Sequence, residues 1–468
     1  MHPADQSEAV SLFSGSGIKV VTGQRFLGGY IGEDDLRREF ASSKIEEWVR
    51  TVEKLSVVGK EHPQDAHAAF IKSFKFRWQY LQRVVKSRGD EFARLRKELR
   101  EKFMPVVVGG DLSSVITDEE CDLFSLSVNN GGLSWSDPTY TADLLFETSR
   151  SGSWVLSESL RSGAPFDIGQ HRTRMFTAKM EAVKRRKEVE DTLLQTILST
   201  FPEDRRRAIC RAVTKHSTAK SSGWLSAIPL LKHHFDLSAS EFRDALAVRY
   251  MRTPVDMPMS CDGCGNPSFS LRHALCCKTG GLVTRRHNEI RDVLGELMAT
   301  AWGNCCKEPI IAAASASSPA LRGDLACRGV WEPQRDALFD VRVIDTDAPS
   351  YVPRPVASVL SAAEEEKKRK YLPACQERHC SFTPLVCSVD GLPAPQMNRF
   401  IDVLGERLAE KWERHQGVVK GWLRARLGFS VIRAASMCVR GTRKRWRSAE
   451  DLLGFLDGAA LQLGLSHR

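Results

Sequence analysis

Four residues that bind soft or borderline metal ions lie close together just past the middle of the chain. The stretch CDGCGNPSFSLRHALCC contains Cys261, Cys264 and His273 and ends with Cys276 and Cys277. Zinc takes four thiolate or imidazole ligands in a tetrahedron, and a Cys-x2-Cys turn presents two sulfurs to one ion. The set Cys261, Cys264, His273 and Cys277 fills all four positions, so we expect a structural zinc ion. The spacing favours Cys277 over Cys276, and a cysteine-rich turn without metal is the alternative.

Acidic and basic residues further along the chain have the types that phosphodiester cleavage requires. Asp324 and Asp340 lie at the ends of expected strands, where their oxygens could hold Mg²⁺. Lys367 could stabilise charge that develops on phosphorus, and Glu308 is a further carboxylate for the metal. The alternation LFDVRVI places Asp340 and Arg342 on one strand face, with valines on the buried face. Because EEEKKRK is also typical of a solvated helix with opposite charges four residues apart, the pattern alone favours that plainer interpretation.

The elements that must position these residues follow from hydrophobic periodicity. Short strands with glycine turns are expected in residues 15–33, and helices are expected from 34 to about 100. Residues 150–250 are expected to be helical and, in places, strongly basic. The remaining expected elements are an amphipathic helix over 285–300, strands over Asp324–Cys327, Leu338–Ile344 and 382–389, a charged helix over 361–372 and mostly helical structure over 396–468.

Composition narrows the class of protein. A chain of 468 residues with 42% hydrophobic and 27% charged residues is typical of a soluble protein with more than one domain. The formal net charge of +10 favours a polyanionic partner. The N-terminal residues MHPADQSEAVSLF lack the basic and then apolar pattern of a signal peptide, so none is expected, and no uncharged apolar run approaches the length that crosses a membrane. The thirteen cysteines, including the adjacent pairs Cys276–Cys277 and Cys305–Cys306, therefore indicate a reducing compartment in which clustered cysteines bind metal.

The motifs of the C-terminal half, taken in order, resemble those of one family. The Cys-Cys-His-Cys knuckle is followed by Arg286-His-Asn288 at a helix start, then by R-x-D-L, D-V-x-V and K-x-x-K-Y. This order resembles the C-terminal restriction-like endonuclease of non-LTR retrotransposons, over about residues 255–395. The resemblance implies a PD-(D/E)xK fold that uses Mg²⁺ to cut DNA.

The resemblance also implies roles for matching residues. Asp324 and Asp340 match the metal-binding carboxylates, and Lys367 matches the catalytic lysine, which this family carries on a helix. Gly323 replaces the usual proline, and the long interval before Lys367 requires residues 345–362 to loop out. Arg342 stands where the general fold has lysine; because arginine stays protonated, we expect a phosphate contact at most. Lys370 and Tyr371 match supporting residues of the same motif. Arg286, His287 and Asn288 match residues that would contact DNA or buttress the site. For His287 the alternative is a hydrogen bond to the knuckle.

The N-terminal third resembles the segment that follows the polymerase palm, including the thumb, in the reverse transcriptases of the same elements. RFLGGYIG, KIEEW, HPQDAHAAF and NNGGLSWSDP carry this resemblance. Nothing resembles the catalytic Tyr/Phe-x-Asp-Asp motif of the palm, so we expect a C-terminal piece of a polyprotein without a polymerase site of its own. An exposed apolar surface is expected on residues 1–150, where the missing palm and fingers would pack.

The expected fold class is α+β with several domains. The expected segments are a thumb-like segment over 1–150, a basic helical linker over 151–254, a CCHC zinc knuckle over 255–281, a restriction-like endonuclease with a central mixed sheet over 282–395, and C-terminal helices packed on the endonuclease over 396–468.

The expected function is metal-dependent nicking of target DNA for target-primed reverse transcription. DNA, and possibly RNA of the element, are the expected partners, in the nucleus or in the cytoplasm before import. The basic run Arg443-Lys-Arg-Trp-Arg447 could serve as an import signal. A nucleic-acid-binding protein without catalysis, derived from a truncated element, and a zinc-stabilised scaffold are the alternatives.

Overall fold

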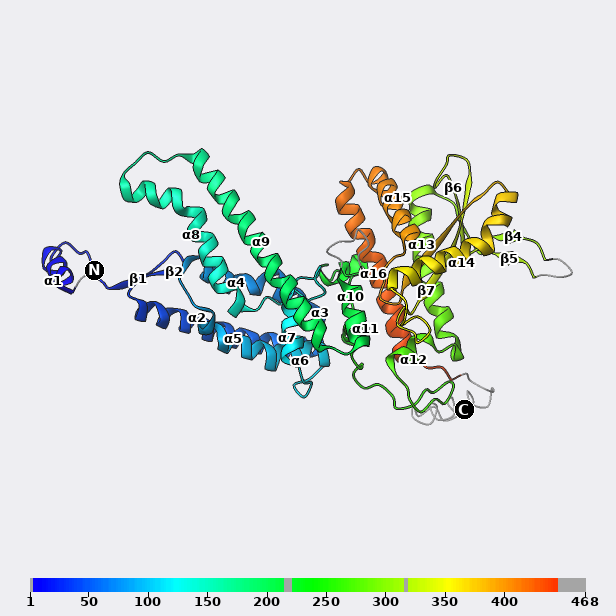
Figure 1. Ribbon diagram of the computed structural model, residues 1–468, viewed down its shortest axis with the longest axis horizontal. Coiled ribbons are helices and arrows are strands. Elements are labelled where there is room, and N and C mark those ends of the chain that lie inside the picture. The colour runs from blue at the N-terminus through cyan, green and yellow to red at the C-terminus, as the bar shows by residue number, and fades with distance from the viewer. Residues whose placement is uncertain (1–2, 214–220, 315–318, 445–468) are drawn as a thin grey trace, which may run out of the picture. The chain divides into compact units, whose positions relative to one another are not determined.

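The computed structural model describes residues 3–213, 221–314 and 319–444 (Figure 1). The protein is of the mixed α+β class, is 62% helical and contains a small mixed sheet. The chain forms two compact units, one of residues 1–217 and 225–243 and the other of residues 218–224 and 244–468. In the described part of the chain, every helix is too short or too polar to cross a lipid bilayer.

The first unit is built almost entirely from helices. The strands expected within residues 15–33 are present as the hairpin β1 (Gly23–Phe26) and β2 (Gly29–Gly32). Pro63 ends the long helix α2 (Asp34–Glu61), because proline cannot continue a helix from its interior. Helix α1 (Pro3–Leu12) precedes the hairpin in the chain. The other α-helices are α3 (Pro63–Ala69), α4 (Lys75–Val84), α5 (Ala93–Glu98), α6 (Met104–Gly109), α7 (Asp118–Ser125), α8 (Pro138–Ser162), α9 (Ile168–Thr200) and α10 (Glu203–Ala212). Residues Phe70–Phe74 and Leu99–Phe103 form π-helical turns.

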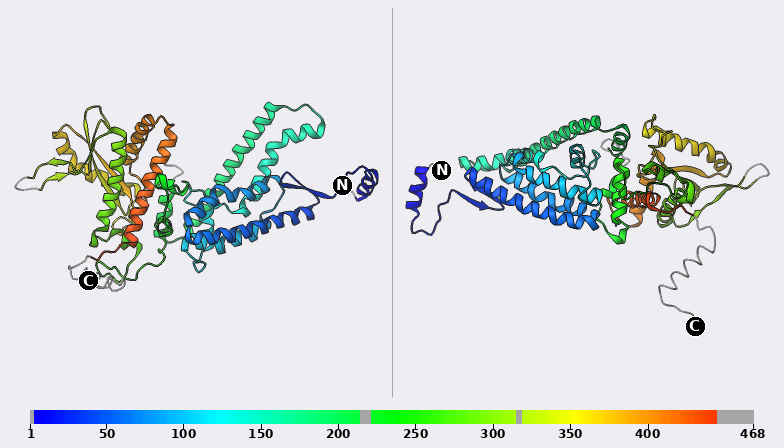
Figure 2. Two further views of the ribbon diagram at one scale, coloured as in Figure 1. Left: turned by 180° about the vertical axis from the view of Figure 1, so that it is seen from behind. Right: turned by 90° about the horizontal axis from the view of Figure 1, so that it is seen from below.

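Side-chain caps fix where several of these helices begin. Thr117 and Glu120 form a reciprocal capping box at the start of α7. The Asp137 carboxylate accepts from the Thr139 amide, and Pro138 occupies the first position of α8. The Asp167 carboxylate caps α9 in the same way, and α8 and α9 then run antiparallel as a helical hairpin (Figures 1 and 2).

An aromatic cluster around Trp135 forms the core of the first unit. The Trp135 ring lies 5.1 Å from that of Phe103 between ring centroids, and Phe103 stacks on Phe70 at 5.0 Å. The indole N–H of Trp135 donates to Nδ1 of the buried His67 at 2.9 Å, and Nε2 of His67 lies 2.9 Å from the carbonyl oxygen of Leu225. Burial lowers the pKa of His67 to about 4, so the imidazole is neutral at pH 7.

Apolar side chains are exposed on the first unit, as the sequence predicts for residues 1–150. In the β1–β2 hairpin, Phe26 is 59%, Leu27 78% and Ile31 67% exposed. More exposed apolar side chains line the α8–α9 hairpin, among them Leu160 and Phe176.

A four-stranded mixed sheet forms the centre of the second unit. Its order is β3 (Cys305–Lys307), β6 (Leu325–Arg328), β7 (Asp336–Ile344) and β8 (Ser381–Ser388). The first three strands are antiparallel, and β7 pairs with β8 in parallel, so the predicted mixed sheet and its three predicted strands are confirmed. Pro384 is tolerated because β8 is an edge strand, where one side needs no backbone donor. A separate two-stranded ribbon joins β4 (Ile310–Ala312) to β5 (Leu321–Arg322).

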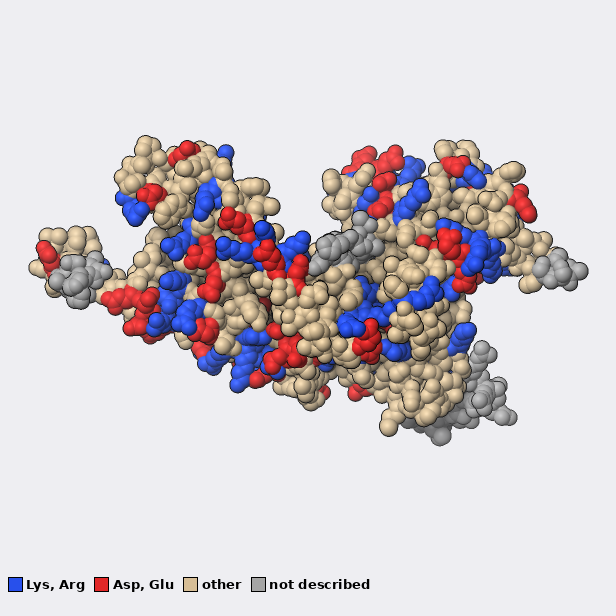
Figure 3. Space-filling view, in the orientation of Figure 1, with Lys and Arg blue, Asp and Glu red and all other residues tan. Residues whose placement is uncertain are grey.

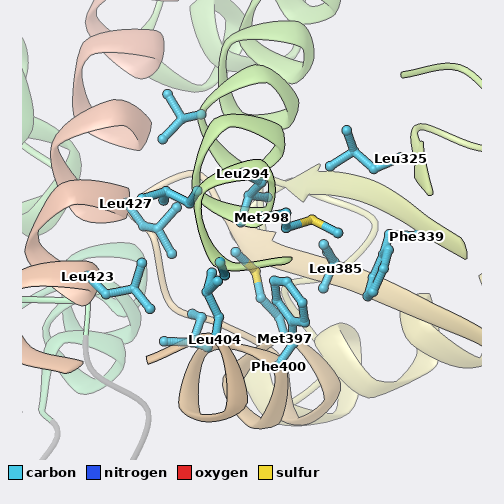
Figure 4. Packing of buried hydrophobic residues seen from close by; sticks show 14 of the residues in the cluster. Leu294, Met298, Leu325, Phe339, Leu385, Met397, Phe400, Leu404, Leu423 and Leu427 are labelled. Carbon is cyan, nitrogen blue, oxygen red and sulfur yellow. The ribbon is translucent and has the colours of Figure 1, made fainter. Parts of the chain in front are cut away.

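Helices cover both faces of this sheet. The predicted amphipathic helix is α13 (Leu282–Trp302), which runs beside α16 (Gln416–Arg440) and also packs on α15 (Pro395–Lys411) (Figures 1 and 2). Together they bury the core shown in Figure 4, which includes Phe339 and Phe400. On the opposite face Leu338 packs with residues of α14 (Val356–Glu377). The period-two alternation predicted for β7 is therefore present.

The loop after β7 is shorter than the sequence suggests. Residues 345–362 were expected to loop out, but α14 begins at Val356. The reason is that Val359 and Leu360 bury against Ile344, so the last part of the expected loop, after Pro355, is helical. The helices predicted within 396–468 are α15 and α16, whereas residues 445–468 lie outside the described residues. The remaining helices, α11 (Ala239–Tyr250) and α12 (Leu271–Cys276), precede the sheet in the chain.

Candidate zinc knuckle and acidic pocket

The four expected zinc ligands converge on one point. The ligand atoms of Cys261, Cys264, His273 and Cys277 all lie within 4.8 Å of one another. Cys261 Sγ is 3.9 Å from Cys277 Sγ, and Cys264 Sγ is 3.4 Å from His273 Nε2. Bonds of about 2.3 Å to sulfur and 2.0 Å to nitrogen in a tetrahedron put ligand atoms roughly 3.5–3.8 Å apart. The donor set and its dimensions therefore fit a zinc ion.

The local backbone prepares these ligands. Gly265, at φ +73°, lets the Cys-x2-Cys turn reverse, and Ser270 caps the short helix α12 that carries His273. Asn266 Nδ2 lies 3.3 Å from His273 Nδ1, on the side of the ring opposite Nε2 and Cys264. Although burial opposes ionisation, the backbone amides of Cys264 and Gly263 lower the pKa of Cys261 to about 6, which favours the thiolate that zinc binds.

Cys276 does not belong to the knuckle. Its thiol donates to Asp345 Oδ2 at 3.4 Å, outside the ligand cluster. Burial and the neighbouring Asp345 carboxylate raise the pKa of Cys276 to about 12, so this cysteine stays a neutral thiol. The spacing argument that favoured Cys277 is confirmed.

A buried arginine from the end of the described chain fills the knuckle. Arg443 is 2% exposed, and its guanidinium donates to the Ala274 carbonyl at 3.0 Å and also to the Cys438 carbonyl. The Arg443 amide donates to Asp262 Oδ2 at 2.8 Å. We refer to residues 441–444 as the C-terminal arm. Arg443, the first residue of the expected import signal, is therefore buried, and residues 445–447 lie outside the described part.

Asp324 is held by the helix that follows the knuckle. Its Oδ1 lies 3.1 Å from Nε2 of His287 on α13, and its Oδ2 accepts from the Val341 amide at 2.6 Å. Among the described residues, the His287 side chain therefore contacts the first expected catalytic carboxylate and not the knuckle. The signal for this contact was the position of His287 at the start of α13, but the helix start alone did not identify its partner.

Asp340 and Lys367 form a buried ion pair. Lys367 Nζ lies 2.6 Å from Asp340 Oδ2, and the two side chains are 20% and 5% exposed. The Tyr371 hydroxyl lies near the same carboxylate. Burial, reinforced by the negative charges of Asp340 and Asp324, raises the pKa of Tyr371, so the phenol stays protonated and can donate.

The sheet brings these groups together because β6 is shorter than β7. The β6–β7 ladder ends at the Leu325–Phe339 pair, so Asp324 and Asp340 are the next residue on each strand. Beyond Phe339, the edge of β7 that faces β6 has no neighbouring strand among the described residues, although β8 pairs with its other edge. The Val341 amide on this open edge donates to the Asp324 carboxylate. A cavity of about 370 Å³ opens at this edge, between α13 and α14. Its lining includes His287, Lys367 and Lys370, with Arg286, Arg342 and Glu366.

The other predicted site residues have partners away from the two aspartates. Glu308 Oε1 accepts from Arg291 at 2.7 Å, although the Glu308 amide donates to the Asp324 carbonyl. Arg342 donates to Glu366 at 2.6 Å, a partner the sequence did not single out. Arg286 is 3% exposed and donates to the Leu275 carbonyl at 2.9 Å, so its guanidinium ties α13 to the knuckle.

The charge run of α14 has two sides. Lys370 lies 4.7 Å from the centroid of the Tyr371 ring, next to the cavity. Lys368 instead pairs with Glu365 at 2.9 Å, and Figure 3 shows blue and red side chains gathered together over α14. The run EEEKKRK therefore combines the expected solvated face with one lysine, Lys367, that turns inward. Asn288 is half-buried on the same helix turn as His287.

Comparison with known proteins adds no further constraint. No family model matches the chain, and a search of curated proteins found no match. The described second unit is thus an α+β domain with a cysteine–histidine cluster that could hold zinc, beside a cavity rich in charged groups.

Proposed function

We propose that the second unit is a metal-dependent DNA endonuclease related to the restriction-like endonucleases of non-LTR retrotransposons. The observation that carries the proposal is that Asp324, held by the Val341 amide, and the Asp340–Lys367 pair both lie where the β6–β7 ladder ends, beside a cavity lined by Lys367 and further cations. The order of sequence motifs around these residues supports the same proposal. In this proposal DNA, and possibly RNA of the element, is the partner, and the nucleus is the site of action.

The chemistry of the donors suits a hard divalent cation. Asp324 and Asp340 would hold Mg²⁺ through carboxylate oxygens, and the metal would supply a more acidic water and a Lewis acid for the phosphate. His287 and the Val341 amide fix the direction of the Asp324 carboxylate. Lys367, released from Asp340 when a cation binds there, would offset charge on the reacting phosphate.

The residues around the cavity suit a phosphodiester substrate. Lys370 and Arg342 present cations to the same space, and the ion pair with Glu366 holds the Arg342 guanidinium in position. The protonated Tyr371 phenol lies near the Asp340 carboxylate. Phosphate contacts of this kind position DNA without reading its sequence, so binding should weaken as salt rises.

One observation favours a second candidate, a nucleic-acid-binding protein without catalysis. Asp340 is fully compensated by Lys367 at 2.6 Å, and Asp324 by His287 and a backbone amide. Charges satisfied in this way need no cation, so the same groups could serve only to hold the sheet edge to its helices.

Nicking of supercoiled plasmid in the presence of Mg²⁺ distinguishes the two. We expect cleavage by the wild type, and a loss of about 10²-fold or more for Asp324→Ala and Lys367→Ala. Lys368→Ala is the matched control, because Lys368 is the next residue on α14 and pairs with Glu365 outside the cavity. Wild-type protein that binds DNA and leaves it uncut, or cleavage that survives in Asp324→Ala, refutes the endonuclease.

A further inference from the structure

Two cysteines outside the zinc knuckle lie opposite each other across the sheet. In the register of β3 and β6, Cys305 pairs with Cys327. Residues directly opposite in an antiparallel ladder have Cα atoms about 4.5 Å apart in non-hydrogen-bonded pairs and about 5.5 Å apart in hydrogen-bonded pairs. The Cα atoms of Cys305 and Cys327 are therefore about 4.5–5.5 Å apart in either kind of pair.

Both thiols also lie on the same face of the sheet. Cys327 belongs to the core beneath α13, and Cys305 packs against that core. Residues directly opposite have Cβ atoms about 4.5–5.5 Å apart, and a disulfide requires Cα atoms 4.4–6.8 Å and Cβ atoms 3.5–4.5 Å apart. The Cα separation already fits, and the Cβ atoms must approach by about 1 Å. Because β3 is an edge strand of only three residues, it can make this movement more easily than a central strand.

The adjacent Cys306 provides the contrast. Successive strand residues point to opposite faces, and the Cys306 thiol is exposed and lies 3.5 Å from the Lys307 carbonyl oxygen. Its pair partner in the register is Ala326, which has no thiol. The adjacent cysteines Cys305 and Cys306 therefore differ in what they can reach.

We propose that Cys305 and Cys327 form a reversible disulfide, which makes this sheet edge a redox-sensitive modification site. The oxidant would be a small disulfide of the glutathione class. The thiolate of the partly exposed Cys305 attacks the oxidant's S–S bond and releases one glutathione thiolate. The thiolate of Cys327 then attacks the Cys305 sulfur and releases the second. The protein loses two electrons and two protons, and the oxidant becomes two molecules of reduced glutathione.

The environment of the two thiols sets the rate at which they are oxidised. Burial raises the pKa of both thiols to about 11, and the charge of a nearby thiolate adds to the shift, from Cys306 for Cys305 and from Cys305 for Cys327. Since the thiolate is the attacking species, oxidation should be slow at neutral pH and should accelerate as pH rises. A disulfide that requires strand movement is strained, and strained disulfides are the more easily reduced ones. The bond should therefore form only in oxidising conditions and open again with excess thiol.

Closure would join two parts of the site region covalently. The ring closed by the disulfide includes Glu308 and Asp324, whose backbones are already hydrogen-bonded across β3 and β6. The disulfide should therefore prevent β3 from separating from β6. This inference does not depend on the endonuclease proposal, because it uses only the register and the positions of the two thiols.

Peptide mapping tests the inference on the full wild-type chain. Protein equilibrated at a series of glutathione redox ratios, in buffer containing zinc, is acid-quenched, alkylated with a maleimide and digested with trypsin. We expect a crosslinked pair of peptides 292–307 and 323–328, lighter by two hydrogens than the sum of the two peptides with only Cys306 alkylated, which disappears when excess dithiothreitol precedes alkylation.

Two variants identify the sulfurs involved. Cys306→Ser should retain the crosslink, and Cys305→Ser should abolish it. A crosslink that persists in Cys305→Ser, a disulfide between Cys305 and Cys306 in the wild type, or alkylation of both Cys305 and Cys327 at every redox ratio overturns the inference. Because the measurement on the wild type requires no mutation, it can refute the proposal even if a variant fails to fold.

Discussion

Acidification should destabilise the first unit through a single buried histidine, His67. Its two ring nitrogens are both engaged: Nδ1 accepts from the Trp135 indole N–H at 2.9 Å, so Nε2 carries the proton and donates to the Leu225 carbonyl. A second proton would have to sit on Nδ1, where it would face the Trp135 donor. Protonation therefore breaks a buried hydrogen bond and also leaves a charge without water, since His67 is 2% exposed.

The sign and size follow from the pKa. In the folded state the pKa of His67 is lowered to about 4, first by burial and further by the charges of Lys75 and Lys72, whereas an unfolded histidine has a pKa of about 6.5. Between these values the unfolded chain binds the proton and the folded chain does not, so stability is complete above about pH 6.5 and is lost as pH falls to about 4. The full loss is about 3 kcal/mol, of which about 2 kcal/mol is reached at pH 5.

The assay compares urea unfolding of the wild type and His67→Gln at pH 5 and pH 7.5. Glutamine can accept from Trp135 and donate to Leu225 without titrating, so the variant controls for every other group that titrates in this range. We expect the wild type to lose about 2 kcal/mol more than the variant between the two pH values. Equal losses in the two proteins, or an NMR titration of His67 in the folded protein near pH 6.5, would refute the reasoning.

Three further outcomes are expected. Cys277→Ser should lower the zinc content measured by atomic absorption and the thermal midpoint, whereas Cys276→Ser should leave zinc at one equivalent, since its thiol lies outside the ligand cluster. Phe400→Ala should cost about 3–5 kcal/mol in urea unfolding, because the side chain is fully buried in the sheet core. Gly280→Ala should cost about 1–3 kcal/mol more than Gly281→Ala. Both glycines have positive φ, but a Cβ at the first would lie 2.5 Å from the C-terminal arm, and a Cβ at the second would meet no atom within 4 Å; equal costs would count against this packing.

Much of the second unit could be predicted from local pattern. The alternation of LFDVRVI identified β7 and the face of Asp340, because a period of two is a property of the strand itself. Ligand spacing identified the knuckle and separated Cys277 from Cys276, because zinc geometry restricts which cysteines can reach one ion.

Contacts between distant segments could not be predicted from local sequence pattern. The open edge of β7 arises because the β6–β7 ladder stops at Phe339, and strand length is set by packing of the whole sheet. Arg286 shows the same limit: a basic residue near a helix start has the same sequence signature whether it faces DNA or, as here, the carbonyl of Leu275. The partner of Arg342 could not be predicted either, because Glu366 lies on a different element, α14.

The burial of Arg443 in the knuckle has a consequence for how the protein is made. A ribosome adds about 5–20 residues per second, so Arg443 is synthesised on the order of ten seconds or more after Cys277. In that interval a nascent knuckle can collect its zinc, yet Asp262 still lacks the Arg443 backbone amide, and the Ala274 carbonyl still lacks the Arg443 guanidinium. The knuckle therefore acquires its last hydrogen bonds only after α16 (Gln416–Arg440), which precedes Arg443 in the chain, has been synthesised, whenever the metal arrives.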